Sequence, residues 1–430
     1  MSPVVAGIEP LHLWNIATAM AVAAPCALVG TLLVARRLSL LGDAIAHAVL
    51  PGIVIAVLAG GRPGGWLTMI GAVAAAIVTA SIATAVASNS VGVGEDAATG
   101  VGFTTMFALG VILVSVAASR VDLDTACVLY GELELSAFDT VPVAGLEIPR
   151  GFITGCLLFA GVGLALCLTW KEQVLAAFDP AAARALGLPV AGLSVALLVG
   201  TALTTVAGFD AVGGVLVVTM LVAPAAAAEL LVARLHHVAA VAVAIGMAAG
   251  AIGYLAAWRL DTGAAGMIAI VLGAVYAVAA LVAPDHGLLA RALGAVALRW
   301  RVAREDYLAA AWRAAEGGTA TVPRGWAAWP VARWLAAEGA VEWTATGWRL
   351  TPTGRARAET IVRSHRLWEA WLGRNVDLPL DHLHPPAEWV EHHIGSAVRA
   401  ILAAEVGDSV ADPHGRSIPP EVPPPAGRAR

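Results

Sequence analysis

Apolar residues dominate the first two thirds of the chain, in long runs separated by short polar breaks. A membrane-spanning helix needs about 20 predominantly apolar residues. Nine runs approach or exceed that length, and they cover residues 13–35, 44–60, 65–88, 99–119, 151–170, 190–209, 212–232, 237–258 and 264–283. The second run is the shortest. We predict an all-α fold that begins with a polytopic membrane helix bundle of about eight or nine spans.

Beyond residue 285 the long apolar runs stop and charged positions become frequent. The first 285 residues hold 9 of the 26 Lys and Arg, which leaves 17 for the last third of the chain. Seven of the 11 histidines also lie in that last third. The chain therefore has a membrane part followed by a soluble part, which is predicted to be mostly helical.

Composition narrows the classes of function. Hydrophobic residues make up 59% of the chain and charged residues 13%, whereas a soluble domain carries about 25% charged residues. Lys171 is the only lysine, and the sequence has no GxxxxGK[ST] phosphate-binding loop. If ATP drives this protein, another chain must hydrolyse it. The four cysteines form no CxxC pair and are interpreted as small hydrophobic residues within helices.

Basic residues near the ends of the runs indicate an orientation in the membrane. If the N-terminus lies outside, the inner loops carry Arg36, Arg37, Lys171, Arg184 and Arg234, followed by the basic start of the soluble part. This modest bias predicts that the soluble part is cytoplasmic and that the protein is a multi-pass protein of the inner (plasma) membrane. Residues 120–150 are too polar to form a simple span, and we expect them to be interfacial or re-entrant.

Two ionisable residues stand inside the second apolar run, in "GDAIAHAVLPG" (42–52). Asp43 and His47 are one helical turn apart, so both side chains lie on one face of a helix. Ionisable groups in hydrocarbon are costly and usually serve an ion, a proton or a partner. One carboxylate and one imidazole suit Mn²⁺, Zn²⁺ or Fe²⁺. The alternative is a buried Asp–His pair that holds two helices together.

The segment "FDPAAARALGLP" (178–189) has the signals of a short helix between two spans. Asp179 is a good N-cap, Pro180 suits the first turn, and Gly187 can end the helix in a left-handed conformation. We predict about two helical turns on the cytoplasmic side. By itself, the pattern fits an ordinary loop helix.

Four segments together resemble the ABC-type zinc/manganese/iron importer permeases, the ABC-3 family, over roughly residues 10–285. They are "RRLSLLGDAIAHAVLPGI" (36–53), "RVDLDTACVLYGELE" (120–134), "DPAAARALGL" (179–188) and "GGVLVVTMLVAPAAAA" (213–228). The resemblance implies a permease that dimerises with a second copy, binds cytoplasmic ATP-binding subunits, and receives metal from an extracytoplasmic metal-binding protein.

The resemblance also assigns roles to residues already singled out. Asp43 and His47 match the acid and histidine of the family's second helix, where they would meet the metal in transit. Such a site should be weak, because the metal must leave it. The helix at 180–186, with Asp179, Pro180, Arg184 and Gly187, resembles the coupling helix that docks into the ATPase.

Residues 304–419 resemble a second family, the metal-dependent repressors of the diphtheria-toxin-repressor type. The matching segments are "REDYLAAAWRAAE" (304–316), "GWRLTPTGRARAETIVRSHRLWEAWL" (347–372), "HLHPPAEWVEHHIGSAV" (382–398) and "DPHGRSIP" (412–419). The resemblance assigns the primary metal site to Asp306, Glu388, Glu391 and His392, and the second site to His365, Glu369 and His384. It gives a chain of four parts: a permease domain (1–285), a linker helix (286–303), a metal-sensing and dimerisation domain (304–419) and a disordered Pro-rich tail (420–430).

The spacing of these residues is chemically reasonable without the resemblance. Glu388, Glu391 and His392 are at i, i+3 and i+4, so they would share one helical face, and His365 and Glu369 are again four apart. Mixed histidine and carboxylate sites suit Mn²⁺, Fe²⁺ or Zn²⁺.

The resemblance itself favours manganese, because Glu388 stands where the iron-type repressors have cysteine and the manganese-type repressors have glutamate. The alternative for each residue is a solvated helix face.

The metal-sensing and dimerisation domain, which with its flanking residues we call the tail from here on, departs from the repressor pattern in two ways. The manganese-type repressors have a second acid at the position of Ala309. The stretch before 347 is also too short for a full helix-turn-helix: one helix is predicted at about 327–338, then wing strands at 340–350. Arg333 is the only basic residue of that helix, whereas a DNA-reading helix needs contacts to phosphates and base edges. We expect a truncated winged-helix remnant that does not bind nucleic acid.

The leading hypothesis is a non-enzymatic importer permease with no organic cofactor, whose cargo is a divalent transition metal, Mn²⁺ ahead of Zn²⁺ or Fe²⁺. Its tail would sense metal and reduce transport when the cell is replete. In one alternative, the tail is a structural dimer clamp without metal. In another, the chain is a membrane-tethered, metal-dependent transcriptional regulator. An intramembrane metalloprotease is disfavoured because the sequence has no HExxH motif.

Overall fold

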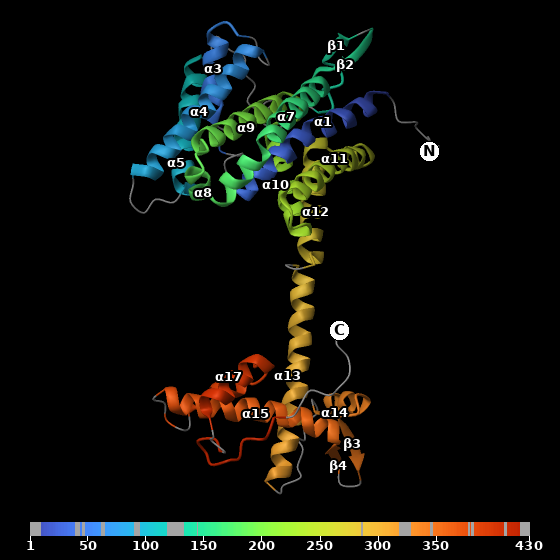
Figure 1. Cartoon of the computed structure of the whole chain (residues 1–430). Coiled ribbons are helices and arrows are strands. Elements are labelled where there is room, and N and C mark those ends of the chain that lie inside the picture. Colours follow the sequence, from blue (N-terminus) through green and yellow to red (C-terminus); the bar gives the residue numbers. More distant parts are fainter. Residues whose placement is uncertain are drawn as a thin grey trace, which may run out of the picture. The chain divides into compact units, whose positions relative to one another are not determined.

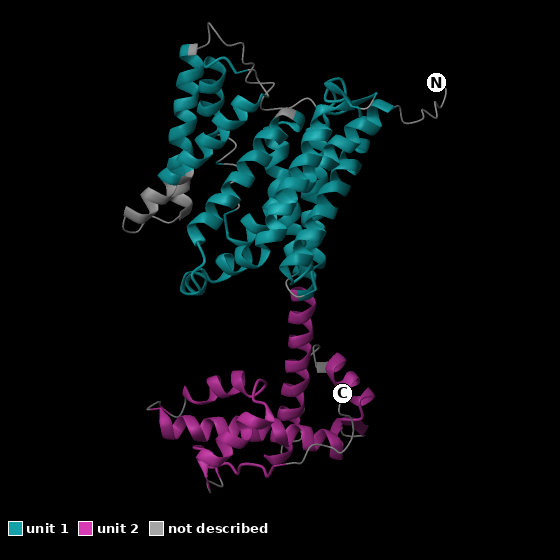
Figure 2. Cartoon of the chain, turned by 45° about the horizontal axis from the view of Figure 1, so that its top comes forward, with its two compact units in different colours: residues 1–290 teal, residues 291–430 magenta. Residues whose placement is uncertain are grey.

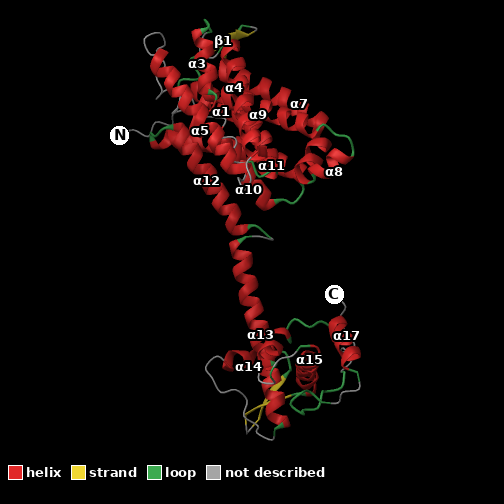
Figure 3. Ribbon diagram, turned by 90° about the vertical axis from the view of Figure 1, so that its left-hand side faces the viewer, coloured by secondary structure: helices red, strands yellow, loops and turns green. Residues whose placement is uncertain are grey.

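The chain forms two compact units, residues 1–290 and 291–430, which Figure 2 colours teal and magenta. The structure is a computed structural model, and it describes residues 10–38, 44, 48–61, 65–89, 95–117, 133–143, 145–284, 287–317, 328–344, 347–376, 379, 382–407 and 411–421. Figure 3 shows that helices make up most of both units. Among the described residues, the strands form two short antiparallel hairpins.

The first unit is a bundle of apolar helices. They are α1 (Pro10–Ala35), α3 (Leu50–Leu58), α4 (Trp66–Asn89), α5 (Glu95–Ala117), α7 (Arg150–Phe178), α8 (Pro180–Ala185), α9 (Val190–Val212), α10 (Gly214–Leu231), α11 (Leu235–Leu260) and α12 (Ala264–Val282). Within the described residues, six helices are long and apolar enough to cross a membrane, namely α1, α7, α9, α10, α11 and α12. Helices α3, α4 and α5 lie in the other three predicted runs. The all-α, multi-pass prediction is confirmed.

Helix α1 is the centre of this bundle (Figure 1). Of its most apolar stretch, 78% of the residues are buried, against 17% for the corresponding stretches of α7 and α12. Small residues allow the close packing that membrane helices need. A methyl group at Gly30 would lie 1.7 Å from the carbonyl oxygen of Leu221, so the backbones of α1 and α10 touch at this point. Substitution of Gly30 would force these two helices apart.

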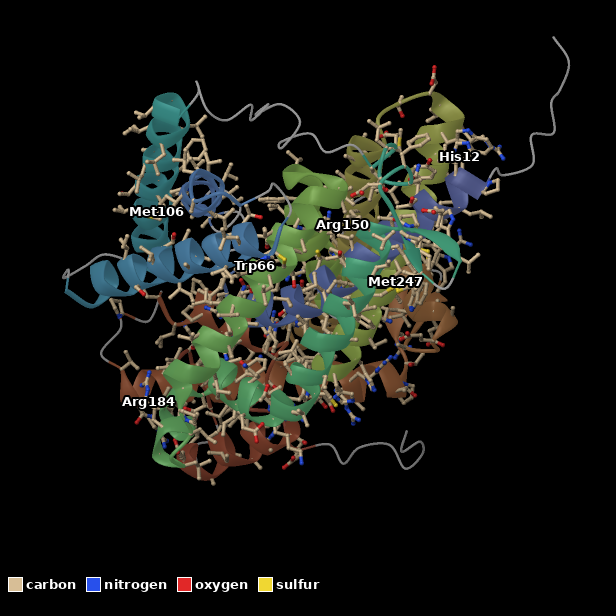
Figure 4. The ribbon with its side chains drawn as sticks, turned by 90° about the horizontal axis from the view of Figure 1, so that it is seen from above. His12, Trp66, Met106, Arg150, Arg184 and Met247 are labelled. Carbon is tan, nitrogen blue, oxygen red and sulfur yellow. The ribbon has the colours of Figure 1, made fainter. Side chains whose placement is uncertain are left out.

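Helices α3, α4 and α5 pack together beside the group formed by α1 and α7 to α12. Gly52 of α3 faces Gly71 of α4, and a methyl group at Gly52 would lie 2.0 Å from the Gly71 carbonyl oxygen. Figure 4 labels Trp66 and Met106 on this smaller group, and Arg150 and Met247 on the larger one.

Only part of the polar segment 120–150 lies in the described residues. Residues 133–139 form turns, and a β-hairpin follows, in which β1 (Thr140–Val143) pairs with β2 (Leu146–Pro149). The turn is fastened to the bundle by polar contacts. Glu134 accepts a hydrogen bond from the Ala264 backbone N–H at the start of α12 (2.7 Å), and Asn15 of α1 donates to the Glu134 carbonyl oxygen (3.2 Å).

The second unit contains α13 (Leu288–Glu316), α14 (Ala328–Ala337), β3 (Val341–Thr344), β4 (Gly347–Leu350), α15 (Pro352–Asn375), α16 (His384–Val390) and α17 (Ser396–Val406). Helix α13 begins within the first unit's residues and runs through residues 288–303 of the segment predicted as a linker helix. Thr351 caps α15 by accepting a hydrogen bond from the Gly354 N–H (3.2 Å), with Pro352 in the first turn. The predicted helix at 327–338 and wing strands at 340–350 are confirmed by α14, β3 and β4.

Candidate metal centres

The intramembrane pair, Asp43 and His47, lies outside the described residues. Of its immediate neighbours, the structure describes Ala44 and Ala48, and both are buried. The role of the pair in metal passage therefore stays a prediction.

Helix α8 forms as predicted between α7 and α9. Asp179 Oδ1 accepts a hydrogen bond from the Ala182 N–H (2.8 Å), and Pro180 occupies the first turn. Gly187 has a positive φ of 79°, and the Leu188 N–H bonds back to the Ala183 carbonyl oxygen (3.0 Å), which completes a Schellman cap. Figure 4 labels Arg184 on this segment.

The outer face of α8 is suited to a protein contact. Ala183 is buried against the neighbouring helices, whereas Leu186 is 71% exposed and Phe178 is 67% exposed. Arg184 is also exposed. An apolar pair beside a cation is a surface that a partner could cover.

Arg36 connects the end of α1 to the helices that carry α8. Its guanidinium donates to Gln173 Oε1 of α7 (2.6 Å) and to Ser194 Oγ of α9 (3.1 Å). Gln173 is buried, and it donates to the Leu193 carbonyl oxygen (3.1 Å). Arg36 thus links the two helices that flank α8 to the chain that leads into the Asp43–His47 segment.

In the second unit, α15 and α16 bring together His365, Glu369 and His384, which we call the Glu369 cluster. Glu369 Oε1 lies 3.1 Å from His365 Nε2 and 2.9 Å from His384 Nδ1, and the two imidazole nitrogens are 2.9 Å apart. His365 and Glu369 are buried, and the His384 side chain is 45% exposed. The predicted i, i+4 pair therefore meets a third candidate ligand from the next helix.

The charges in the Glu369 cluster shift two pKa values. Burial of the Glu369 carboxylate tends to raise its pKa, but hydrogen bonds from His365 and His384 outweigh burial and lower the pKa to about 2. Burial of His365 tends to lower its pKa, whereas Glu369 and Glu391 outweigh burial and raise it. Glu369 is thus an ionised acceptor that attracts cations.

Helix α13 and the turn after α16 form a second group, Glu305, Asp306, Glu391 and His392, which we call the His392 cluster. His392 Nε2 lies 3.0 Å from Asp306 Oδ1, and its Nδ1 lies 2.7 Å from Glu305 Oε2. Hydrogen bonds to Asp306 and then Glu305 raise the pKa of His392 to about 9, against the opposing effect of burial. His392 is therefore held as a cation between two carboxylates.

Arginine side chains also reach the His392 cluster. Arg313 Nη2 lies 3.2 Å from Glu391 Oε2, and the Glu391 side chain is only 2% exposed. Arg301 Nε lies 4.0 Å from Glu305 Oε1. The cluster thus has positive charge of its own beside its carboxylates.

Glu388 does not join the residues with which it was grouped in the sequence. Its side chain is 58% exposed, and Oε1 lies 3.3 Å from His384 Nε2 of the Glu369 cluster. Glu391 is the C-cap of α16 and its N–H still bonds to the Ala387 carbonyl oxygen (2.9 Å), but its side chain is buried whereas that of Glu388 is exposed, so the structure does not bring Glu388 together with Glu391 and His392. The His393 N–H bonds to the Val390 carbonyl oxygen (2.8 Å), a tighter turn after Glu391.

Four residues near these clusters were not predicted as site residues: Glu305, Arg313, Asp412 and His414. Glu305 directly precedes Asp306, and Arg313 lies one turn after Ala309, where an acid was expected. Asp412 and His414 belong to "DPHG", a segment that carried the resemblance without a role for its side chains. Within the described residues, Glu369, Asp412 and His414 form a further group of possible ligands.

Both clusters can hold a divalent transition metal by their donor chemistry. Each offers imidazole nitrogen and carboxylate oxygen, a combination that suits Mn²⁺, Fe²⁺ or Zn²⁺. Each also positions a histidine through its far nitrogen: His365 Nδ1 lies 2.6 Å from Glu391 Oε2, and His392 Nδ1 faces Glu305. A carboxylate behind a metal-binding histidine fixes the ring and raises its basicity.

Known proteins resemble the two units separately. Residues 351–420 match the model of the "Iron dependent repressor, metal binding and dimerisation domain", which includes both α15 and α16. The chain is 41% identical over 283 residues to the manganese transport system membrane protein MntD of Bacillus subtilis, covering 65% of this chain and 95% of MntD.

A second relative and a solved structure cover the same region. The zinc transport system membrane protein TroD of Treponema pallidum is 36% identical over 281 residues, which span 65% of this chain and 76% of TroD. The structure of PsaBC from Streptococcus pneumoniae in complex with Fab aligns with a TM-score of 0.55 and 26% identity, over 65% of this chain and 95% of that chain. Residues 10–283, well over half of the chain, match the model of the ABC 3 transport family. The chain belongs to the ABC 3 transport family.

Proposed function

We propose that this protein is the membrane-spanning permease subunit of an ATP-driven importer of a divalent transition metal, and that its tail senses the same metal inside the cell. The family match over residues 10–283 carries the transport function. MntD belongs to a manganese transport system and TroD to a zinc transport system, and the higher identity to MntD makes Mn²⁺ the first candidate cargo. A ligand set of one acid and one imidazole suits either ion.

Asp43 and His47 are the residues through which we propose that the metal passes. Their support is the sequence: an acid and an imidazole one helical turn apart in an apolar run. Asp43→Ala and His47→Ala should each abolish uptake of radioactive Mn²⁺ while the protein still reaches the membrane. Glu147→Ala, an exposed acid on β2, is the matched control. Uptake that survives both intramembrane substitutions would refute this path.

Transport of this kind needs partners, and α8 supplies the surface for one of them. We propose that cytoplasmic ATP-binding subunits dock on α8, that an extracytoplasmic metal-binding protein delivers the cargo, and that two copies of this chain pair. The capped helix with exposed Leu186 and Arg184 supports the first assignment. Loss of Asp179 as N-cap should destabilise α8 by about 1 kcal/mol. Asp179→Ala should then lower metal-dependent ATP hydrolysis by the assembled importer.

The tail would regulate transport through its two clusters. We propose that cytoplasmic metal fills the tail when the cell is replete and that uptake then falls. The test is Mn²⁺ uptake after growth in low or high metal, for the native chain, a chain lacking residues 291–430, and the full-length double variant His365→Ala/Glu369→Ala. Uptake by both variants should stay high after growth in high metal. A truncated chain that is still inhibited would refute the sensor.

A second candidate function for the tail is a purely structural dimer clamp. Arg313 supports it, because its guanidinium lies 3.2 Å from Glu391 Oε2 and pairs with a carboxylate of the His392 cluster. The same experiment separates the two functions. If truncation changes uptake but His365→Ala/Glu369→Ala does not, the tail acts through its structure alone.

A further inference from the structure

The first half of α13, residues 288–304, carries an apolar stripe that the described residues leave exposed. Leu289, Leu293, Val296 and Trp300 are spaced at i, i+4, i+7 and i+11, so they lie along one face of the helix. Their exposed fractions range from 43% to 61%. An apolar helix face of this kind normally packs against the interior of a protein or against a membrane surface.

The same face of α13 is covered farther along the helix. Tyr307 lies two turns after Trp300 on the stripe, and it is buried in a core that includes Leu335 of α14 and Ala358 of α15. The second half of α13 is thus a core element of the tail, whereas the first half has no such cover among the described residues. Because α13 is one uninterrupted helix, whatever covers the stripe also restrains the tail.

Arginine residues surround the stripe. Residues 288–304 hold four arginines, no lysine and no acid. The four are Arg291, Arg299, Arg301 and Arg304. With 3.6 residues per turn, Arg299 and Arg304 fall at the two edges of the stripe. Arginines in such positions can bury their methylene groups along an apolar surface while the guanidinium stays in a polar layer.

The tail does not neutralise all of this positive charge. Arg304 Nη1 lies 2.7 Å from Glu338 Oε1 and is therefore paired within the tail. Arg291 and Arg299 are exposed, and no carboxylate of the described residues pairs with either of them. These two guanidinium groups are available to an anionic partner.

The position of the stripe in the chain and its charge both favour a lipid surface as that partner. The last candidate span, α12, ends at Val282, and α13 begins at Leu288. Arginine clusters directly beyond a membrane helix attract anionic lipid headgroups, and each residue near the surface raises the binding constant roughly fivefold. A tryptophan such as Trp300 is also favoured at the level of the headgroups.

A second copy of α13 fits the stripe less well. If two parallel helices packed along it, Leu293 and Trp300 would occupy the a positions of a heptad pattern. Arg299 would then lie at a g position and face Arg304 at the e position of the other helix. Like charges would meet at the edge of the seam, whereas a layer of lipid phosphates would neutralise them.

We propose that residues 288–304 form an amphipathic anchor that binds anionic phospholipids in the membrane leaflet on the side of the tail. The apolar stripe enters the boundary between headgroups and acyl chains, and Arg291 and Arg299 contact lipid phosphates. The anchor needs no metal, and it restrains the tail through the continuous helix α13.

The test uses the full chain in phosphatidylcholine nanodiscs in which the phosphatidylglycerol fraction is raised stepwise. A spin label is attached at Val296→Cys on the stripe or at Leu298→Cys on the opposite face, in a background that lacks the four native cysteines. Oxygen concentrates in lipid, whereas a nickel chelate stays in water. As phosphatidylglycerol rises, the label at 296 should become more accessible to oxygen and less accessible to nickel, and the label at 298 should stay accessible to nickel.

Charge variants identify the residues that hold the anchor. Arg291→Gln/Arg299→Gln should lower the ratio of docked to undocked helix by roughly 30-fold at a given phosphatidylglycerol fraction. The matched control is Arg333→Gln/Arg349→Gln, which removes two exposed arginines from α14 and β4 and should leave docking unchanged. In 1 M salt, where the Debye length is about 3 Å, docking of the native chain should weaken.

Three results would overturn the anchor. One is a label at 296 whose accessibility does not depend on phosphatidylglycerol. Another is equal loss of docking in both double variants, because the attraction would then follow from net charge alone. The third is shielding of the label at 296 from oxygen and nickel together, with spin–spin broadening between labels, because a second copy of α13 would then cover the stripe.

Discussion

The Glu369 cluster and the His392 cluster share ligand chemistry but differ in the charge that surrounds it. In the first, histidines gather around one buried, ionised carboxylate. In the second, three carboxylates gather around one protonated histidine, and Arg313 already pairs with Glu391. A metal ion entering the His392 cluster must displace a proton and compete with a guanidinium. We therefore expect the Glu369 cluster to bind metal more tightly near neutral pH.

The largest expected effect is the difference in Zn²⁺ affinity between two histidine variants, one in each cluster. His365→Ala removes a buried ligand from the Glu369 cluster and should weaken the tightest Zn²⁺ site of the full chain by roughly 100-fold, as loss of a key ligand contact does. His392→Ala should leave that site within a few-fold of native. Calorimetric titration of both variants measures the contrast. Equal losses would show that the clusters form one site.

A smaller effect should follow from removal of the competing cation. Arg313→Gln frees Glu391 and should strengthen Mn²⁺ binding at the His392 cluster by about tenfold, since one charge contact is worth roughly 1.4 kcal/mol in such a setting. Arg355→Gln, which breaks an exposed pair with Glu359, is the control. Weaker Mn²⁺ binding in Arg313→Gln would mean that Arg313 organises the cluster.

The protonated state of His392 predicts a pH dependence for the metal-free protein. Its pKa in the folded state, about 9, exceeds the ordinary value of 6.5. The ion pairs with Asp306 and Glu305 therefore stabilise the fold fully below pH 6.5, and this stabilisation is lost as the pH rises through about 9. Thermal unfolding in a chelator should show native protein more stable than His392→Gln at pH 6.5, with the gap closing by about pH 10. A difference in thermal stability that does not change with pH would contradict the proposed ion pairs of protonated His392.

The smallest effect is expected for Glu388. Because its side chain is 58% exposed and its carboxylate lies 3.3 Å from the outer nitrogen of His384, Glu388→Gln should change affinity at either cluster less than about threefold. The same titrations measure it. A large loss confined to Mn²⁺ would restore Glu388 to the primary site that the sequence resemblance assigned.

The sequence was most informative where the signal is local. Apolar runs predicted the positions of the helices in the first unit, and Asp179, Pro180 and Gly187 predicted α8 because caps act within a few residues. The four-residue spacing of His365 and Glu369 likewise predicted a contact within α15. Such signals need no knowledge of the tertiary fold.

The composition of the clusters could not be predicted in the same way. Arg313 meets Glu391 across 78 residues, and His414 reaches Glu369 across 45, through a loop in which Asp412 accepts hydrogen bonds from two backbone N–H groups. Glu388 was grouped with Glu391 and His392 from its spacing, whereas in the structure its side chain is exposed and contacts His384. Contacts between distant segments follow from packing, which spacing alone does not encode.

One buried carboxylate of the His392 cluster, Glu391, also contacts the Glu369 cluster. Glu391 Oε2 lies 2.6 Å from His365 Nδ1, and Oε1 lies 3.7 Å from His392 Nε2. A cation that binds His365 and Glu369 would change the contact between His365 and Glu391. The affinity of the His392 cluster for its own cation would then change as well. Thermodynamic reciprocity then requires that each ion change the affinity of the other by the same factor. Through Glu391, regulation by the tail would depend on the joint occupancy of two metal sites and not on the concentration of one metal alone.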